Sequence, residues 1–394
     1  MSSTTTGIEK GLPFRAAWWL PGGDLQTLWG RIARGRRRVA FRRERLETPD
    51  GDELVLDHVE GPDGASLSRD RALPSLGPGL DAAFPRRAPR LLVLHGLEGS
   101  SYSVYVQGIL AAAARWGLRG AALNFRSCAR DPSNLDRMLP NRRPRLYHSG
   151  ETEDLDFVAR TLAARDPGAP LLAVGVSLGG NVLLKWLGER SGRIPVAAAA
   201  ALSTPYDLAA SARHLETPRG RFYVGSFLST LRRKAIDSAR RFPEAASRID
   251  LPRVQRARTF HEFDDAATAP LHGFAGADDY YRRSSSLAFL PGIAIPTLCV
   301  SAKDDPFLRP ESLAQAREAA PSSVEFRVTE HGGHIGFVGG IRPWRPEYWA
   351  EELAVAWLAK HAGVRTKKEP GSGPSAPPAR KSRKPTATRE SEAQ

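Results

Sequence analysis

The sequence predicts an α/β fold with a mostly parallel central sheet. Short apolar runs, typical of buried parallel strands, recur along the chain at 90–96, 120–125, 171–177, 196–203 and 297–303. Helical patterns separate several of these runs, at 102–117, 151–166 and 181–190. Because strands and helices alternate in this way, we expect right-handed βαβ units with helices flanking the sheet.

Two further runs extend the predicted sheet. Residues 53–59, ELVLDHV, alternate in polarity as a half-exposed strand does, and residues 324–329, VEFRVT, have the composition of a strand. Ligands of open α/β sheets bind beyond the carboxyl ends of the strands. Functional residues are therefore expected in the loops that follow the strands.

Breaks in composition divide the chain into three parts. We expect an N-terminal arm with a basic stretch at 1–45, one folded domain at 46–363, and a tail at 364–394. Proline, serine and basic residues dominate the tail, which has too few apolar side chains to form a core and is predicted to be disordered. Within the domain, glycine and proline breakers at 61–90 indicate a long surface loop.

A second long segment, at about 205–296, separates two strands of the core. It exceeds an ordinary connection and is predicted to be a helical cap or lid. Within it, residues 207–236 have the periodicity of an amphipathic helix, which could cover the core or face an acyl chain. Tyr280 and Tyr281 could line a pocket or serve in packing.

The net charge of +14 is concentrated at two places. The stretch 31–45 carries +7 and the stretch 365–394 carries +5, so the remainder is close to neutral. A basic active site is therefore not indicated, and nucleic acid is not an expected partner. The two stretches could be solvated, or the arm could contact phosphate or an anionic membrane surface.

Two cysteines, Cys128 and Cys299, cannot form a disulfide framework and lack metal-binding spacing, as in proteins of a reducing compartment. The N-terminus lacks the features of a signal peptide, and no apolar run is long enough to span a membrane. We therefore expect a cytoplasmic protein, with peripheral membrane contact through the arm as an open alternative.

The stretch Gly175-Val176-Ser177-Leu178-Gly179 lies between an apolar strand and a helical pattern. Glycine and serine are ordinary turn residues, so this G-x-S-x-G pattern alone is only suggestive. At the end of a strand, however, it predicts a nucleophile elbow that exposes the hydroxyl of Ser177. A serine nucleophile needs a base and an orienting acid, in the chain order serine, acid, histidine.

Both partners follow in that order. The run SAKDDPFLRP at 301–310 places Asp304 and Asp305 after a strand, and TEHGGHIGFVGG at 329–340 places two histidines in a glycine-rich loop. Singly, the aspartates could cap a turn, and His331 or His334 could face solvent. Their joint occurrence favours a catalytic triad, with Asp305 preferred over Asp304 because of the Pro-Phe-Leu sequence that follows it.

The strand 91–94 leads into His95-Gly96-Leu97, where a backbone amide could face the nucleophile. The N–H groups of Leu97 and Leu178 are the expected oxyanion donors. His95 is expected to have a structural role and not to act as a base.

Several ordered blocks resemble the YheT-like family of α/β-hydrolase fold esterases, related to abhydrolase proteins that cleave lipid esters. Examples are FRAAWWLPGGDLQTLWG, LHGLEGSSYSVYV, LNFRSCARDPSN, GVSLGGN, FDDAATAPLHGFAGADDYYRRSS, KDDPFL and GGHIGFV, and the similarity extends from about residue 13 to 359. The resemblance implies an α/β-hydrolase core with helical cap segments, no metal or other cofactor, and a triad of Ser177, Asp305 and His334.

The chain departs from the family at GGDLQT, residues 22–27, where NPHLQT is frequent, at FRSC, where FRGC is frequent, and in the longer loop 61–90. No triad residue is lost, but the substrate preference need not be shared. The expected function is a serine hydrolase that cleaves carboxylic esters with an apolar acyl chain through an acyl-enzyme. An acyltransferase using the same intermediate, and a non-catalytic protein that binds membrane or nucleic acid, remain alternatives.

Overall fold

The fold is given by a computed structural model that describes residues 13–35, 39–59 and 87–364. Its main element is an eight-stranded sheet with the order β1-β2-β4-β3-β7-β8-β9-β10. The strands are β1 Phe41–Glu47, β2 Glu53–Val59, β3 Arg90–Leu94, β4 Arg119–Asn124, β7 Leu171–Val176, β8 Val196–Leu202, β9 Thr297–Ala302 and β10 Val324–Thr329. From β4 to β10 neighbouring strands are parallel, whereas β1 and β2 are antiparallel to their neighbours.

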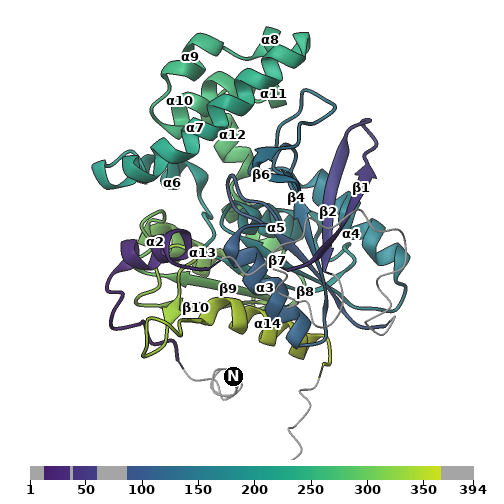
Figure 1. Ribbon diagram of the computed structural model, residues 1–394, viewed down its shortest axis with the longest axis vertical. Coiled ribbons are helices and arrows are strands. Elements are labelled where there is room, and N and C mark those ends of the chain that lie inside the picture. The colour runs from purple at the N-terminus through teal and green to yellow at the C-terminus, as the bar shows by residue number, and fades with distance from the viewer. Residues whose placement is uncertain (1–12, 36–38, 60–86, 365–394) are drawn as a thin grey trace, which may run out of the picture. The chain divides into compact units, whose positions relative to one another are not determined.

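Helices cover both faces of this sheet (Figure 1). On one face α4, α5 and α13 share an apolar core with the strands, and on the other face α3 and α14 do so. Their bounds are α3 Val104–Arg115, α4 Glu153–Arg165, α5 Leu178–Arg190, α13 Pro310–Ala319 and α14 Trp349–His361. The expected α/β fold with a mostly parallel sheet is thus confirmed, and the strand ends meet at one edge, as such a sheet requires.

Strand β1 begins within the predicted arm, residues 1–45, and ends at Glu47 in the predicted domain, so this end of the arm is part of the central sheet. Its seven residues are mostly polar and half-buried. A search for apolar runs in the sequence therefore does not find this strand. The structure also corrects the expectation that 53–59 is half exposed, since all seven residues of β2 are buried. Burial is possible because Asp57 pairs with Arg43 at 2.7 Å, and His58 contacts Glu44 at 2.8 Å, across the β1–β2 ladder.

The segment between β8 and β9 consists of helices that group together beside the sheet (Figure 1). We call residues 205–296 the insertion. Its elements are α6 Leu208–His214, α7 Pro218–Arg241, α8 Pro243–Arg248, α9 Leu251–Arg256, α10 Phe260–Phe263, the π-helix η2 Asp264–Thr268, α11 Ala269–His272, α12 Ala277–Ser284 and the 3-10 helix η3 Ser286–Gly292.

The single amphipathic helix expected at 207–236 is in fact two helices, α6 and α7. The break has a local cause in the Thr-Pro-Arg-Gly sequence. Thr217 caps α7 by accepting the Gly220 N–H, and Pro218 occupies the first turn, where a missing N–H costs nothing.

The remaining elements are short. Helix α2 spans Gly23–Ile32, and two small antiparallel pairs are formed by β5 Arg130–Asp131 with β6 Asn134–Met138, and by β11 Val338–Gly339 with β12 Glu347–Tyr348. No helix among the described residues has both the length and the apolar character needed to cross a membrane. Residues 61–86 of the predicted loop, and the tail from residue 365, lie outside the described residues.

Candidate active site

Ser177 occupies the turn between β7 and α5 with a strained backbone. Its φ of 54° and ψ of −120° lie where non-glycine residues are rare, and such strain is typical of functional turns. The glycines on either side of Ser177 are required because other backbone segments lie too close to leave room for a side chain. A Cβ on Gly175 would lie 2.3 Å from the carbonyl oxygen of Gly179, and a Cβ on Gly179 would lie 2.5 Å from that of His95.

The three residues expected to form a triad lie in one hydrogen-bonded chain. The Ser177 Oγ is 2.9 Å from His334 Nε2, and His334 Nδ1 is 2.8 Å and 3.1 Å from the two carboxylate oxygens of Asp305. His334 and Asp305 are 6% and 4% exposed. Because an ionised carboxylate can only accept hydrogen bonds, Nδ1 of His334 carries the ring proton and donates it to Asp305. Nε2 is then free to accept the proton of the serine hydroxyl.

Asp304, which the sequence analysis did not choose as the triad acid, contacts a different part of the loop that carries His334. Its carboxylate accepts the Gly333 N–H at 2.8 Å and lies 3.3 Å from Nδ1 of His331. The His331 side chain is largely exposed. The two Asp-His contacts are therefore separate, one at the hydroxyl of Ser177 and one at the loop surface.

Helix α2 is hydrogen-bonded to the loop that carries His334. The sequence analysis did not predict this contact. Thr27 Oγ accepts the His334 N–H at 2.8 Å and donates to the Gly23 carbonyl at 2.6 Å. Gln26 is fully buried and exchanges two hydrogen bonds with the backbone of Val338, at 2.7 Å and 3.1 Å. The Gln-Thr pair of the GGDLQT block was the available signal.

The expected oxyanion donors belong to the same cavity as Ser177. Leu97 and Leu178 both line the cavity that contains Ser177 and His334. Leu178 is the first residue of α5, and N–H groups in the first turn of a helix have no partner within it. The predicted structural role of His95 agrees with its contacts, since Nδ1 is bonded to the Gly96 carbonyl and Nε2 accepts the Phe125 N–H. Burial lowers the pKa of His95 to about 4, so the ring stays neutral.

The cavity has a volume of about 610 Å³ and is lined by both the core and the insertion. Apolar residues of the insertion form much of its wall: Leu208, Ala212, Leu215, Phe227, Leu231, Phe260 and Phe263. Tyr280 and Tyr281 both line the cavity and pack, because Tyr280 accepts the Ser149 N–H at 2.9 Å and Tyr281 donates to Asp264 at 2.7 Å. Phe307 lies against the His334 ring with the centroids 4.2 Å apart.

A buried ion pair joins the insertion to the loop of Leu97. Lys234 of α7 lies 2.6 Å from the Glu98 carboxylate, and both side chains are less than a tenth exposed. Tyr147 binds Glu98 twice, donating its hydroxyl proton to the carboxylate and accepting the Glu98 N–H, each at 2.8 Å. Burial raises the pKa of the Glu98 carboxyl, but the charge of Lys234 and hydrogen bonds with Lys234, Tyr147 and Thr230 together lower it below its ordinary value. Glu98 also has a strained φ of 56°, so this pair fixes an unusual backbone next to Leu97.

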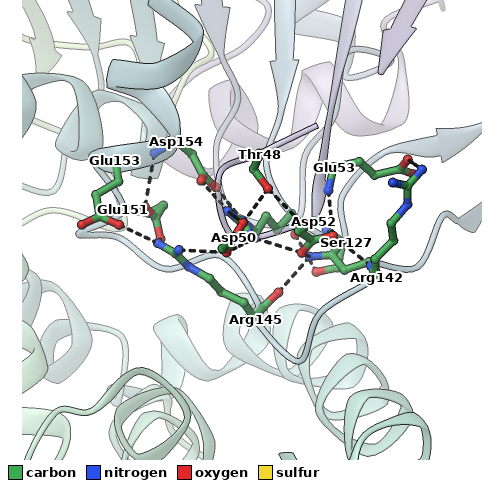
Figure 2. A network of polar contacts seen from close by, with 12 residues as sticks. Thr48, Asp50, Asp52, Glu53, Ser127, Arg142, Arg145, Glu151, Glu153 and Asp154 are labelled. Carbon is green, nitrogen blue, oxygen red and sulfur yellow. Dashed lines mark hydrogen bonds and ion pairs between the residues drawn. The ribbon is translucent and has the colours of Figure 1, made fainter. Parts of the chain in front are cut away.

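A second buried network joins the β1–β2 turn, the loop after β4 and the start of α4 (Figure 2). Its centre is Arg126, whose side chain is 1% exposed. The guanidinium bonds Asp154 through two nitrogens, at 2.7 Å and 2.8 Å, and contacts Asp50 and Asp52 at 2.9 Å each. Figure 2 also shows Arg145 between Asp50 and Glu151. The network ties the β1–β2 turn to the start of α4.

The family model described as the alpha/beta hydrolase fold matches residues 89–340. YheT from Escherichia coli (strain K12), an esterase by name, is 38% identical over 86% of this chain and 90% of its own length. The mouse phospholipase ABHD3 is 31% identical over 81% of this chain and 71% of its own, and the monoacylglycerol lipase of Saccharomyces cerevisiae is 28% identical over 81% and 74%. The resemblance seen in the sequence is confirmed, as is the expectation of an enzyme of the hydrolase class: the chain belongs to the alpha/beta hydrolase family and is a relative of YheT.

Proposed function

We propose that this enzyme hydrolyses carboxylic esters with an apolar acyl chain, using Ser177 as nucleophile. The observation that carries the proposal is the hydrogen-bonded chain from Ser177 through His334 to Asp305 at the wall of an apolar cavity. The names of the relatives, which include an esterase, a phospholipase and a lipase, support the choice of an ester bond.

Each step follows from the positions of these groups. Ser177 Oγ attacks the ester carbonyl carbon while His334 Nε2 takes the hydroxyl proton, and Asp305 stabilises the imidazolium that forms. The N–H groups of Leu97 and Leu178 hold the oxyanion. Collapse of the tetrahedral intermediate breaks the ester bond, and the alcohol leaves with the proton from His334. Water, deprotonated by the same nitrogen, then releases the acid and restores Ser177.

We further propose that the insertion, residues 205–296, is a cap that selects the acyl chain. Its apolar side chains line the cavity next to Ser177. Transfer of an apolar chain from water into such a wall stabilises the bound state in proportion to the area buried. A substrate with a longer acyl chain should therefore gain affinity until the cavity is filled.

A panel of p-nitrophenyl esters from acetate to palmitate tests the substrate class. We expect kcat/KM to rise with chain length from acetate by about threefold to fourfold per methylene while the chain fits, given ~0.8 kcal/mol for each buried methylene. A flat profile would contradict an apolar acyl site. Adding short alcohols separates hydrolysis from acyl transfer: we expect mainly free acid, and a dominant transfer product would make the enzyme an acyltransferase.

The Glu98–Lys234 pair is expected to position the loop that carries Leu97, one of the two proposed oxyanion donors. Replacing Lys234 by methionine leaves the Glu98 charge buried and unpaired next to Leu97. A shift of that loop of about 1 Å can lower kcat on the order of a hundredfold. KM for a short ester should change little, because the apolar wall remains intact.

The double variant Lys234→Met with Glu98→Gln removes both charges and should recover much of the lost kcat. Lys360→Met, on the exposed end of α14, is the matched control and should behave as the parent. Thermal unfolding reports any general loss of stability. Equal kcat in parent and Lys234→Met, with both folded, would contradict this role of the pair.

A further inference from the structure

The large apolar side chains that are most exposed in the described part of the chain gather on three segments. These are Trp18, Leu25 and Ile32 near the N-terminus, Phe222 in α7, and Ile341 and Trp344 in the β11–β12 turn. Trp18, Phe222, Ile341 and Trp344 are 71% to 82% exposed. We call this set the aromatic face.

Hydrogen bonds and an ion pair join the segments that carry these side chains. The Trp18 indole N–H donates to the Ile341 carbonyl at 3.0 Å, and the Trp19 indole donates to that of Gly340 at 3.1 Å. At the other end, Asp24 of α2 accepts the Tyr223 hydroxyl at 2.8 Å and pairs with Arg219. Residues 18–25 thus adjoin the β11–β12 turn on one side and the first turns of α7 on the other.

Exposed arginines are close in sequence to the residues of the aromatic face. The turn reads Ile-Arg-Pro-Trp-Arg at 341–345, with every residue exposed, and exposed Arg15 and Arg221 lie close to Trp18 and Phe222 in sequence. Among the residues that the structure describes, no ion pair involves Arg15, Arg221, Arg342 or Arg345. The carboxylate of Asp24 is already compensated by Arg219. The surface therefore combines exposed tryptophans with uncompensated positive charge.

The aromatic face also adjoins the cavity. Helix α2 contributes Leu25 and Ile32 to the face, and Thr27, Leu28 and Gly30 to the cavity lining. Helix α7 contributes Phe222 to the face and the next residue, Tyr223, to the lining. A ligand held at this surface would consequently lie beside helices α2 and α7, which line the cavity that contains Ser177.

We infer that the aromatic face docks onto an anionic lipid surface. Tryptophan side chains prefer the boundary between headgroups and acyl chains, and arginines beside them are attracted to anionic headgroups. A neutral protein partner would not need the arginines, and a second copy of this chain would bring the same positive charge against itself. The inference does not depend on the proposed ester hydrolysis, because docking is defined by binding alone.

The test is co-sedimentation of the full chain with vesicles of phosphatidylcholine, with and without phosphatidylglycerol. We expect binding to the anionic vesicles that weakens as salt is raised. The double variant Trp344→Ser with Phe222→Ser should lose at least tenfold in partitioning. The variant Arg342→Glu with Arg345→Glu should lose the preference for phosphatidylglycerol. Neither pair lines the cavity, so turnover of a soluble short ester should stay near that of the parent.

The basic tail is the matched control. Arg380→Glu with Arg383→Glu reverses as much charge outside the aromatic face, and we expect it to retain most of the binding. If the tail variant lost binding and the face variants kept it, the inference would be wrong. The inference would also be wrong if the parent protein bound neither kind of vesicle. A dimer seen by sedimentation velocity, abolished by Trp344→Ser with Phe222→Ser in a protein that does not bind vesicles, would instead make the aromatic face a contact between two copies of the chain.

Discussion

Replacing Ser177 by alanine is expected to lower kcat for a short ester on the order of a millionfold. In the proposed mechanism the hydroxyl forms the acyl-enzyme, while His334 and Asp305 act on its proton. The alanine side chain differs by one oxygen, so the turn between β7 and α5 should keep its backbone. Thermal unfolding should accordingly shift by little.

Ser211→Ala provides the matched control for this change. Ser211 lines the same cavity, and its Oγ is buried with no hydrogen-bond partner among the described residues. Its loss should leave kcat within about threefold of the parent, as expected for removal of a group that makes no transition-state contact. If Ser177→Ala retained most of its activity, another residue would have to be the nucleophile.

The second large effect distinguishes the two adjacent aspartates. Asp305→Asn should lower kcat on the order of ten-thousandfold, because an amide in this position favours the wrong tautomer of His334. Asp304→Asn should cost about tenfold or less, since the amide oxygen can still accept the Gly333 N–H and only the loop is perturbed. Steady-state kinetics of the two purified variants give the ranking.

Because each variant exchanges one carboxylate for an amide of the same shape, Asp304→Asn is the control for Asp305→Asn. The reverse ranking would make Asp304 the orienting acid, although its carboxylate contacts Gly333 and His331. If both variants were as active as the parent, no carboxylate would orient His334, and the proposed triad would fail.

The parts of the site that follow strands were accessible from the sequence. The turn at Ser177 and the loop of His334 each carry local signals, glycines and a strand before them, that do not depend on distant residues. The choice of Asp305 over Asp304 rested on the residues that follow, and the geometry gives it a direct contact with His334.

The residues that position the site from distant parts of the chain could not be predicted from local sequence patterns. Thr27 and Gln26 form hydrogen bonds with residues about three hundred positions away in the sequence. Lys234 likewise forms an ion pair with Glu98, which is distant in the sequence. Such pairs leave no periodicity or local motif, because their burial depends on a partner that only the fold supplies. Strand β1 was missed for a related reason, since Arg43 and Glu44 are half-buried and paired with residues of β2, whereas their polarity suggests exposure.

Labelling with a fluorophosphonate, followed by peptide mapping, tests the central claim most directly. The reagent phosphonylates an activated serine and releases fluoride, so it needs the nucleophile, the base and the oxyanion donors together but no knowledge of the natural ester. We expect one adduct per chain, on Ser177, with turnover falling in proportion to labelling and no adduct in Ser177→Ala. An adduct on another residue, or full turnover by the fully labelled enzyme, would contradict the assignment of Ser177 as the nucleophile.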